Sequence, residues 1–96
     1  MQIFLKKVLT NPIQYAIIYT WKGDDNMKEK LIKYFEILEA YAMSEKDYPT
    51  SRTCFDQAFG ALYFCVMNLA TNEESDELIH LWELEWRPRF ESIMYN

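Results

Sequence analysis

The sequence predicts a single all-α domain, a compact bundle of about four helices with a short N-terminal arm or helix. Half of its 96 residues are hydrophobic, and three Trp, seven Tyr and six Phe are among them. A chain of this length builds one core, because separate cores form only beyond about 250 residues. Only two Gly and three Pro interrupt the chain, too few for the frequent turns of an all-β domain. We therefore treat residues 1–96 as one helical domain.

The first two expected elements lie in the N-terminal quarter of the chain. Residues 1–9 carry apolar side chains at helical spacing and predict a short helix or a packed arm. A helix is expected over residues 12–22. Asn11 is a suitable N-cap, Pro12 suits the first helical position, and Gly23 suits the residue just past the end.

The next helix is the clearest in the sequence. Apolar residues recur every three or four positions from Met27 to Ala42, the pattern of an amphipathic helix with one buried face. Asp24 and Asp25 come just before it, where carboxylates favour the positive end of the helix dipole. The helix is expected to stop within residues 44–49. Its solvent-facing charges are Lys28, Glu29, Lys33, Glu36 and Glu39.

A further helix is predicted from Thr50 or Ser51 to about Thr71. It is apolar nearly all round, which indicates burial by neighbouring helices. Its expected core face consists of Phe55, Ala58, Phe59, Leu62, Cys65, Val66 and Leu69. Its opposite, mixed face consists of Asp56, Gln57, Gly60, Phe64, Met67 and Asn68.

The last helix opens at a capping-box pair, Thr71 and Glu74. Pro88 lacks an amide hydrogen, and its ring would strike the carbonyl four residues earlier. We therefore expect the helix to kink or end near Arg87 and to resume as far as Met94. Its expected core face consists of Leu78, Ile79, Trp82 and Trp86.

The charge distribution argues against a nucleic-acid partner. The formal net charge is −5, whereas duplex binding needs a basic surface that neutralises phosphates. The only basic bias is formed by Lys6, Lys7 and Lys22. A regulator that touches nucleic acid through these lysines, or mimics it through its acids, is the third hypothesis that we keep.

The cysteines and the apolar runs predict a cytoplasmic protein with no membrane partner. Cys54 and Cys65 are eleven positions apart on one expected helix, about 16 Å along its axis, so they cannot bridge each other. Buried free thiols suit a reducing compartment. The longest uncharged apolar run, 58–67, is about half of a membrane span, and the N-terminus lacks the pattern of a secretory signal.

The sequence contains no specific catalytic motif, so we expect no enzyme activity, no cofactor and no metal. Glu77 and His80 have the Glu-x-x-His spacing of di-iron bundles, but such a site needs two of these motifs and two further glutamates. The chain has one histidine. A small metal- or ligand-binding bundle that uses His80 with Asp76, Glu77 and Glu83 is the second hypothesis.

The leading hypothesis is a non-catalytic helical interaction module that forms a homodimer or binds another protein. The mixed face carries more apolar character than a small monomer needs. Trp and Arg are enriched at contact hot spots, although core packing would also explain Trp86. Small, acidic, aromatic-rich chains are also typical of accessory proteins of bacteria and their mobile elements. The expected interface residues are Gly60, Phe64, Met67, Asn68, Trp86, Arg87 and Arg89.

Overall fold

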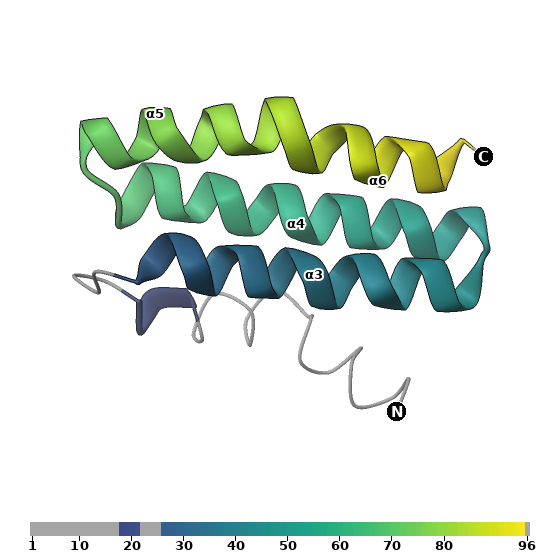
Figure 1. The fold of residues 1–96 in the computed structure, drawn as a ribbon. Coiled ribbons are helices and arrows are strands. Elements are labelled where there is room, and N and C mark those ends of the chain that lie inside the picture. The colour runs from purple at the N-terminus through teal and green to yellow at the C-terminus, as the bar shows by residue number, and fades with distance from the viewer. Residues whose placement is uncertain (1–17, 22–25, 96) are drawn as a thin grey trace.

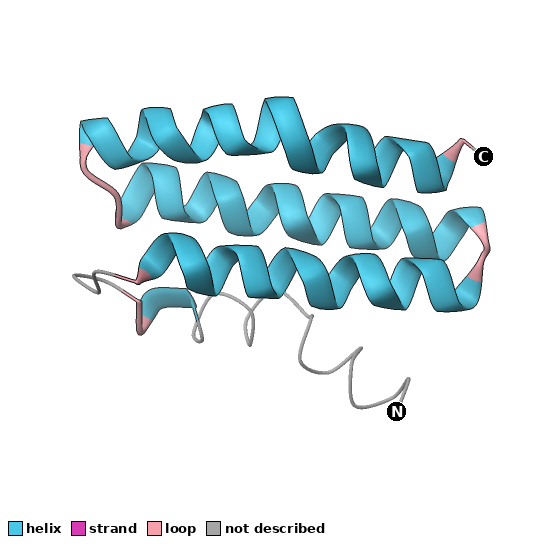
Figure 2. Ribbon diagram, viewed as in Figure 1, coloured by secondary structure: helices cyan, strands magenta, loops and turns pink. Residues whose placement is uncertain are grey.

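The computed structural model describes residues 18–21 and 26–95, and these residues build an all-α arrangement of antiparallel helices (Figures 1 and 2). Most of the helix expected over 12–22 and the whole arm expected over 1–9 lie outside the described residues. Within them, the all-α prediction is confirmed. The helical elements are α3 (Met27–Glu45), α4 (Tyr48–Asn68), and a continuous C-terminal helix made of α5 (Asn72–Leu81), the π-helical segment η1 (Trp82–Trp86) and α6 (Arg87–Met94).

The backbone conformation of Lys46 ends α3. Asn26 is the N-cap residue, while Asp24 and Asp25 are outside the described part of the chain. At the other end Lys46 adopts the left-handed conformation, with φ of 57°, and its amide donates to the carbonyl of Ala42 at 3.1 Å. This conformation is a common way to finish a helix. The predicted stop within residues 44–49 is therefore confirmed.

The helix α4 begins two to three residues earlier than predicted. Asp47 is the N-cap, and its side chain accepts a hydrogen bond from the amide of Thr50 at 2.8 Å. Pro49 lies in the first turn, where its missing amide hydrogen costs nothing. The helix also ends earlier than expected, at Asn68.

The C-terminal helix starts as predicted and then differs from the prediction. The Thr71 hydroxyl accepts from the amide of Glu74 at 3.2 Å, and the Glu74 carboxylate accepts from the amide of Thr71 at 2.8 Å, which completes the capping box. The helix does not end near Arg87, and a wide π turn precedes this residue. The Arg87 amide donates to the carbonyl of Trp82, five residues back, and the helix continues through Pro88.

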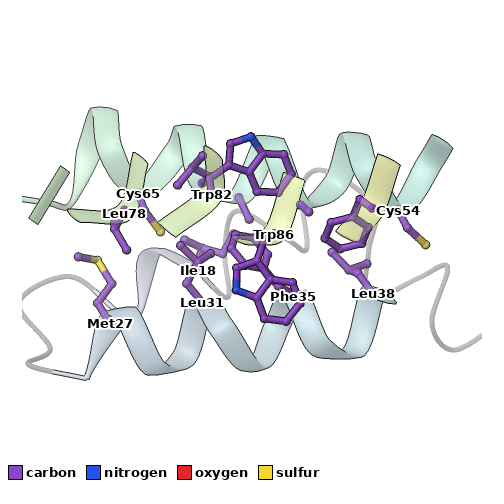
Figure 3. Packing of buried hydrophobic residues seen from close by; sticks show 14 of the residues in the cluster. Ile18, Met27, Leu31, Phe35, Leu38, Cys54, Cys65, Leu78, Trp82 and Trp86 are labelled. Atoms are coloured by element: carbon purple, nitrogen blue, oxygen red, sulfur yellow. The ribbon is translucent and has the colours of Figure 1, made fainter. Parts of the chain in front are cut away.

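The core lies between α3, α4 and the C-terminal helix, and aromatic rings dominate its centre (Figure 3). The ring of Phe35 on α3 lies 5.5 Å from that of Trp82 and 5.4 Å from that of Trp86. Offset and tilted ring pairs at such distances are favourable. Ile18 and Trp21 from the segment before α3 also belong to the core.

The orientation of α4 corrects the predicted core face. Its buried residues are mostly small, and Phe59, placed on the core face by the sequence pattern, is 44% exposed. Phe55, Val66 and Leu69 are only half-buried, and Ile79 on α5 is exposed as well. The bulk of Phe35 and the tryptophans explains the difference, because a small α4 face lets these rings fill the space between the helices. The buried residues of α4 are Ser51, Cys54, Ala58, Ala61, Leu62 and Cys65.

Candidate functional site

A shallow, open groove with a volume of about 720 Å³ runs along the side of α4 that faces away from the core. Its position follows from the orientation of α4 about its own axis, which directs large side chains of this helix outward. We call this surface the outer face of α4. It consists of Arg52, Asp56, Phe59, Gly60, Tyr63, Phe64, Met67 and Asn68.

Large apolar side chains stand exposed on the outer face. Phe59 is 44%, Tyr63 57% and Met67 61% exposed. The rings of Phe59 and Tyr63, one helical turn apart, stack with centroids 6.4 Å apart and an interplanar angle of 16°. Phe59 also meets the ring of Trp82 edge-on at 6.0 Å, which holds the stack on the core. The outer face is therefore an ordered aromatic surface.

The outer face carries one charged pair of zero net charge. Arg52 and Asp56 form an ion pair at 3.3 Å between Nε and Oδ1, with both side chains about half exposed. The Asp56 carboxylate raises the pKa of Arg52 above its ordinary value. The Arg52 guanidinium also lies 5.9 Å from the centre of the Phe55 ring. Because each charge has a partner, the face can contact an apolar surface without a lone charge at its centre.

Five of the six predicted mixed-face residues lie on the outer face, and Gln57 does not line the groove. Gly60, Phe64 and Asn68 line the groove, and Met67 is exposed beside them. The Asn68 side-chain amide donates to the carbonyl of Phe64 at 3.2 Å, which orders this end of the groove. Sequence reasoning missed Tyr63, although its spacing of four from the neighbouring phenylalanine was a detectable signal. It also missed the contribution of Arg52 and Phe59 to this groove.

The other expected interface residues lie elsewhere and contact their own chain. Trp86 is only 2% exposed and belongs to the core, so it presents almost no surface to a partner. The Arg89 guanidinium lies 4.0 Å from the centre of the Trp86 ring and donates to both carboxylate oxygens of Glu39, at 2.7 and 2.6 Å. Arg87 pairs with Glu83 at 3.1 Å within the C-terminal helix.

The surroundings of His80 add no support to a metal site. Its Nδ1 lies 2.7 Å from the backbone carbonyl of Asp76. Glu77, the acid of the Glu-x-x-His motif, forms an ion pair with Lys28 of α3. Across residues 18–21 and 26–95, no three His, Cys, Asp or Glu side chains come together in a group that could hold a metal ion.

Both cysteines are buried free thiols, as the sequence predicted. Burial raises the pKa of Cys54 to about 11, with a smaller contribution from the charge of Asp47, and it raises the pKa of Cys65 to about 12. A thiol needs its thiolate form to act as a nucleophile. Neither cysteine is therefore placed for chemistry at neutral pH.

The comparisons with known proteins add no family assignment. No family model, no curated protein and no solved structure matches this chain. None of the described helices is long and apolar enough to cross a membrane. Lys6, Lys7 and Lys22, on which the nucleic-acid hypothesis depends, lie outside the described residues.

Proposed function

We propose that this protein is a non-catalytic helical interaction module that associates with itself through the outer face of α4. The observation that carries the proposal is the exposure of Phe59, Tyr63 and Met67 on adjoining turns of one helix. Contiguous apolar surface is rare on soluble monomers and marks contact sites. Aromatic residues and Met are also enriched at protein interfaces, whereas charged residues are depleted at their centres.

Elsewhere in residues 18–21 and 26–95, exposed apolar side chains such as Ile37, Met43 and Leu84 stand beside charged residues. The outward side of α3 carries Lys28, Glu29, Lys33 and Glu36, and the outward side of the C-terminal helix carries Glu83, Glu85 and Arg87. Such charges favour water over an apolar partner. We further propose a cytoplasmic location, since buried reduced thiols such as Cys54 and Cys65 suit a reducing compartment.

The proposal predicts that Tyr63→Glu will halve the mass of the protein in solution without unfolding it. The substitution places a carboxylate in a contact that excludes water, and an unpaired buried charge is unfavourable. Tyr63 is more exposed than the half-buried Phe64, so its replacement leaves the core intact. The measurement is light scattering after size exclusion, with circular dichroism on the same samples.

Ile37→Glu is the matched control. Ile37 is an apolar residue of α3 that is 51% exposed, close to the value for Tyr63, but it lies on a different helix. This variant should keep the mass of the wild type. Self-association through α4 is wrong if the wild type has the mass of one chain at every concentration, or if the Tyr63 variant keeps the wild-type mass.

A further inference from the structure

We propose that two copies pack α4 against α4 in antiparallel orientation about a two-fold axis, with Tyr63 of each copy seated over the partner subunit's Gly60. The inference rests on the proposed function and specifies its geometry. A central stripe runs along the outer face through Asp56, Gly60, Tyr63 and Met67. Its spacings of four, three and four residues place these positions on one side of the helix and are typical of helices that interlock side chains.

The shapes within the stripe complement each other under this symmetry. Gly60 has no side chain and forms part of the groove, whereas Tyr63, less than one turn away, is 57% exposed and projects from the helix. A two-fold axis perpendicular to α4, passing between these two positions, exchanges them. Each tyrosine then meets the other copy's glycine, where the two backbones approach closely.

The same axis brings the flanking aromatic residues together. Phe59 and Phe64 lie on opposite flanks of the stripe. An antiparallel two-fold pair sets each flank of the stripe against the same flank of the other copy, so Phe59 lies near the partner subunit's Phe59 and Phe64 near the partner subunit's Phe64. Ring pairs of this kind stabilise a contact beyond the burial of their area.

Charge placement selects the antiparallel arrangement. No charged residue occurs between Asp56 and Glu73, so the charges of the outer face are confined to the N-terminal part of α4. A parallel pair would set Asp56 beside the partner subunit's Asp56, with the same repulsion between the two Arg52 side chains. An antiparallel pair sets Asp56 opposite the neutral Met67 end, and it also aligns the two helix dipoles favourably.

Charge also favours a second copy as the occupant. The chain carries a net charge of −5, so two copies repel each other unless they meet at a neutral surface. The outer face is neutral because Arg52 and Asp56 pair within it. A neutral face that contains both a hollow and the projection that fills it is complementary to itself.

Two single-cysteine additions test the orientation. Asp56→Cys and Met67→Cys replace exposed residues at opposite ends of the stripe, whereas the native Cys54 and Cys65 are buried. The variants are treated with a short bifunctional maleimide, separately and as a co-expressed mixture. In the mixture, mass spectrometry should find linked dimers that contain one copy of each variant. Neither variant treated alone should give a linked dimer. Untreated wild type and maleimide-treated wild type are the controls.

The other outcomes each overturn a defined part of the inference. Linkage of each variant with itself would show a parallel pair. A dimeric mass with no linkage in any sample would place the contact on another face. A wild-type mass of one chain would reject the proposed function itself, and the inference with it.

Gly60→Leu independently tests the contact of Tyr63 with the partner subunit's Gly60. A leucine fills the hollow, so the mass should fall by half, while helicity stays equal or rises because glycine is a poor helix former. Gly60→Leu with the full wild-type mass would contradict the pairing of Tyr63 with the partner subunit's Gly60. Loss of helicity would also contradict it, since the site would then belong to the monomer's own packing.

Discussion

The neighbouring helices α3 and α4 divide their side chains in opposite ways. The helix α3 buries large residues such as Leu31, Phe35 and Leu38, and it exposes charges. The helix α4 buries mostly small ones, while it exposes Phe59 and Tyr63. Hydrophobicity alone would place the aromatic rings of both helices inside.

Side-chain size decides which face of α4 is buried. Phe35 of α3 and Trp82 and Trp86 of the C-terminal helix meet at the centre of the core (Figure 3). A protein interior is close-packed, so a third large surface would not fit between them. The small face of α4 completes the core, and the aromatic side chains that remain lie exposed on the outer face.

The largest effect that would test this comparison is expected for Leu62→Ala. Leu62 is 5% exposed on the inner face of α4, and Met67 is 61% exposed on the outer one. Truncation of Leu62 should lower the free energy of unfolding by about 2–5 kcal/mol through lost burial and a cavity. Met67→Ala, the control, should cost less than about 0.5 kcal/mol in urea titrations carried out on monomeric protein. Equal costs would show that the two faces are not distinct.

A second test uses the thiols of the inner face. Because burial raises the pKa of Cys54 to about 11 and that of Cys65 to about 12, from a value of 9.0, the folded state favours the protonated thiols. The resulting stability is fully present below pH 9 and is lost as the pH rises from 9 towards 12. Cys54→Ala and Cys65→Ala should each lessen this alkaline loss, measured as the urea midpoint against pH.

The same thiols should resist labelling in the folded protein. At pH 8 a thiol reagent should modify Cys65 only after denaturant is added, because the folded site excludes both the reagent and the thiolate form. The control is the single added cysteine of Met67→Cys, on the outer face, which should react at once. Rapid modification of Cys65 without unfolding would contradict the assignment of the inner face.

The smallest effect is expected at the edge of α3, for Arg89→Lys. The arginine donates two hydrogen bonds to Glu39 and stacks over Trp86, and a lysine reproduces neither the fork nor the stacking. Both groups are partly exposed to solvent, so the loss should be about 0.5–1 kcal/mol and should shrink in high salt. Arg87→Lys is the matched control, because its ion pairs within the described part of the chain are with Glu83 and Glu91 of its own helix. A larger loss at Arg87 would contradict this account.

The helix limits that depend on nearby residues could be predicted from the sequence. Thr71 and Glu74 carry the whole signal of the capping box within four residues, and the structure contains it. The start of α4 was harder to predict. Thr50 and Ser51 are as suitable for capping as Asp47, and the choice among them depends on the path of the chain from α3.

The candidate site could be predicted only in part. The mixed face was recognised through Gly60 and Phe64, which do line the groove. Phe59 was assigned to the core because a helix that is apolar nearly all round has no unique buried side. The orientation of α4 about its axis is set by rings such as Phe35 and Trp82, which are distant in the sequence. The periodicity of apolar residues in α4 contains no information about the volumes of these rings. Likewise, Pro88 signals a disturbed helix but not a π turn.

The π turn is also informative about how this chain tolerates changes in length. Every fourth residue from Leu78 to Met94 is buried. In a regular α-helix, the directions of residues four apart differ by roughly 40° around the axis, so such a series would turn away from the core. The π turn contains one residue more than an α turn, and this extra residue corrects the change in direction. Leu84 lies in this turn and is 78% exposed, so its deletion would leave an ordinary helix with the same residues facing inward. A single deletion within α4 has no such wide turn to remove, and it would rotate one half of that helix by about 100° relative to the other.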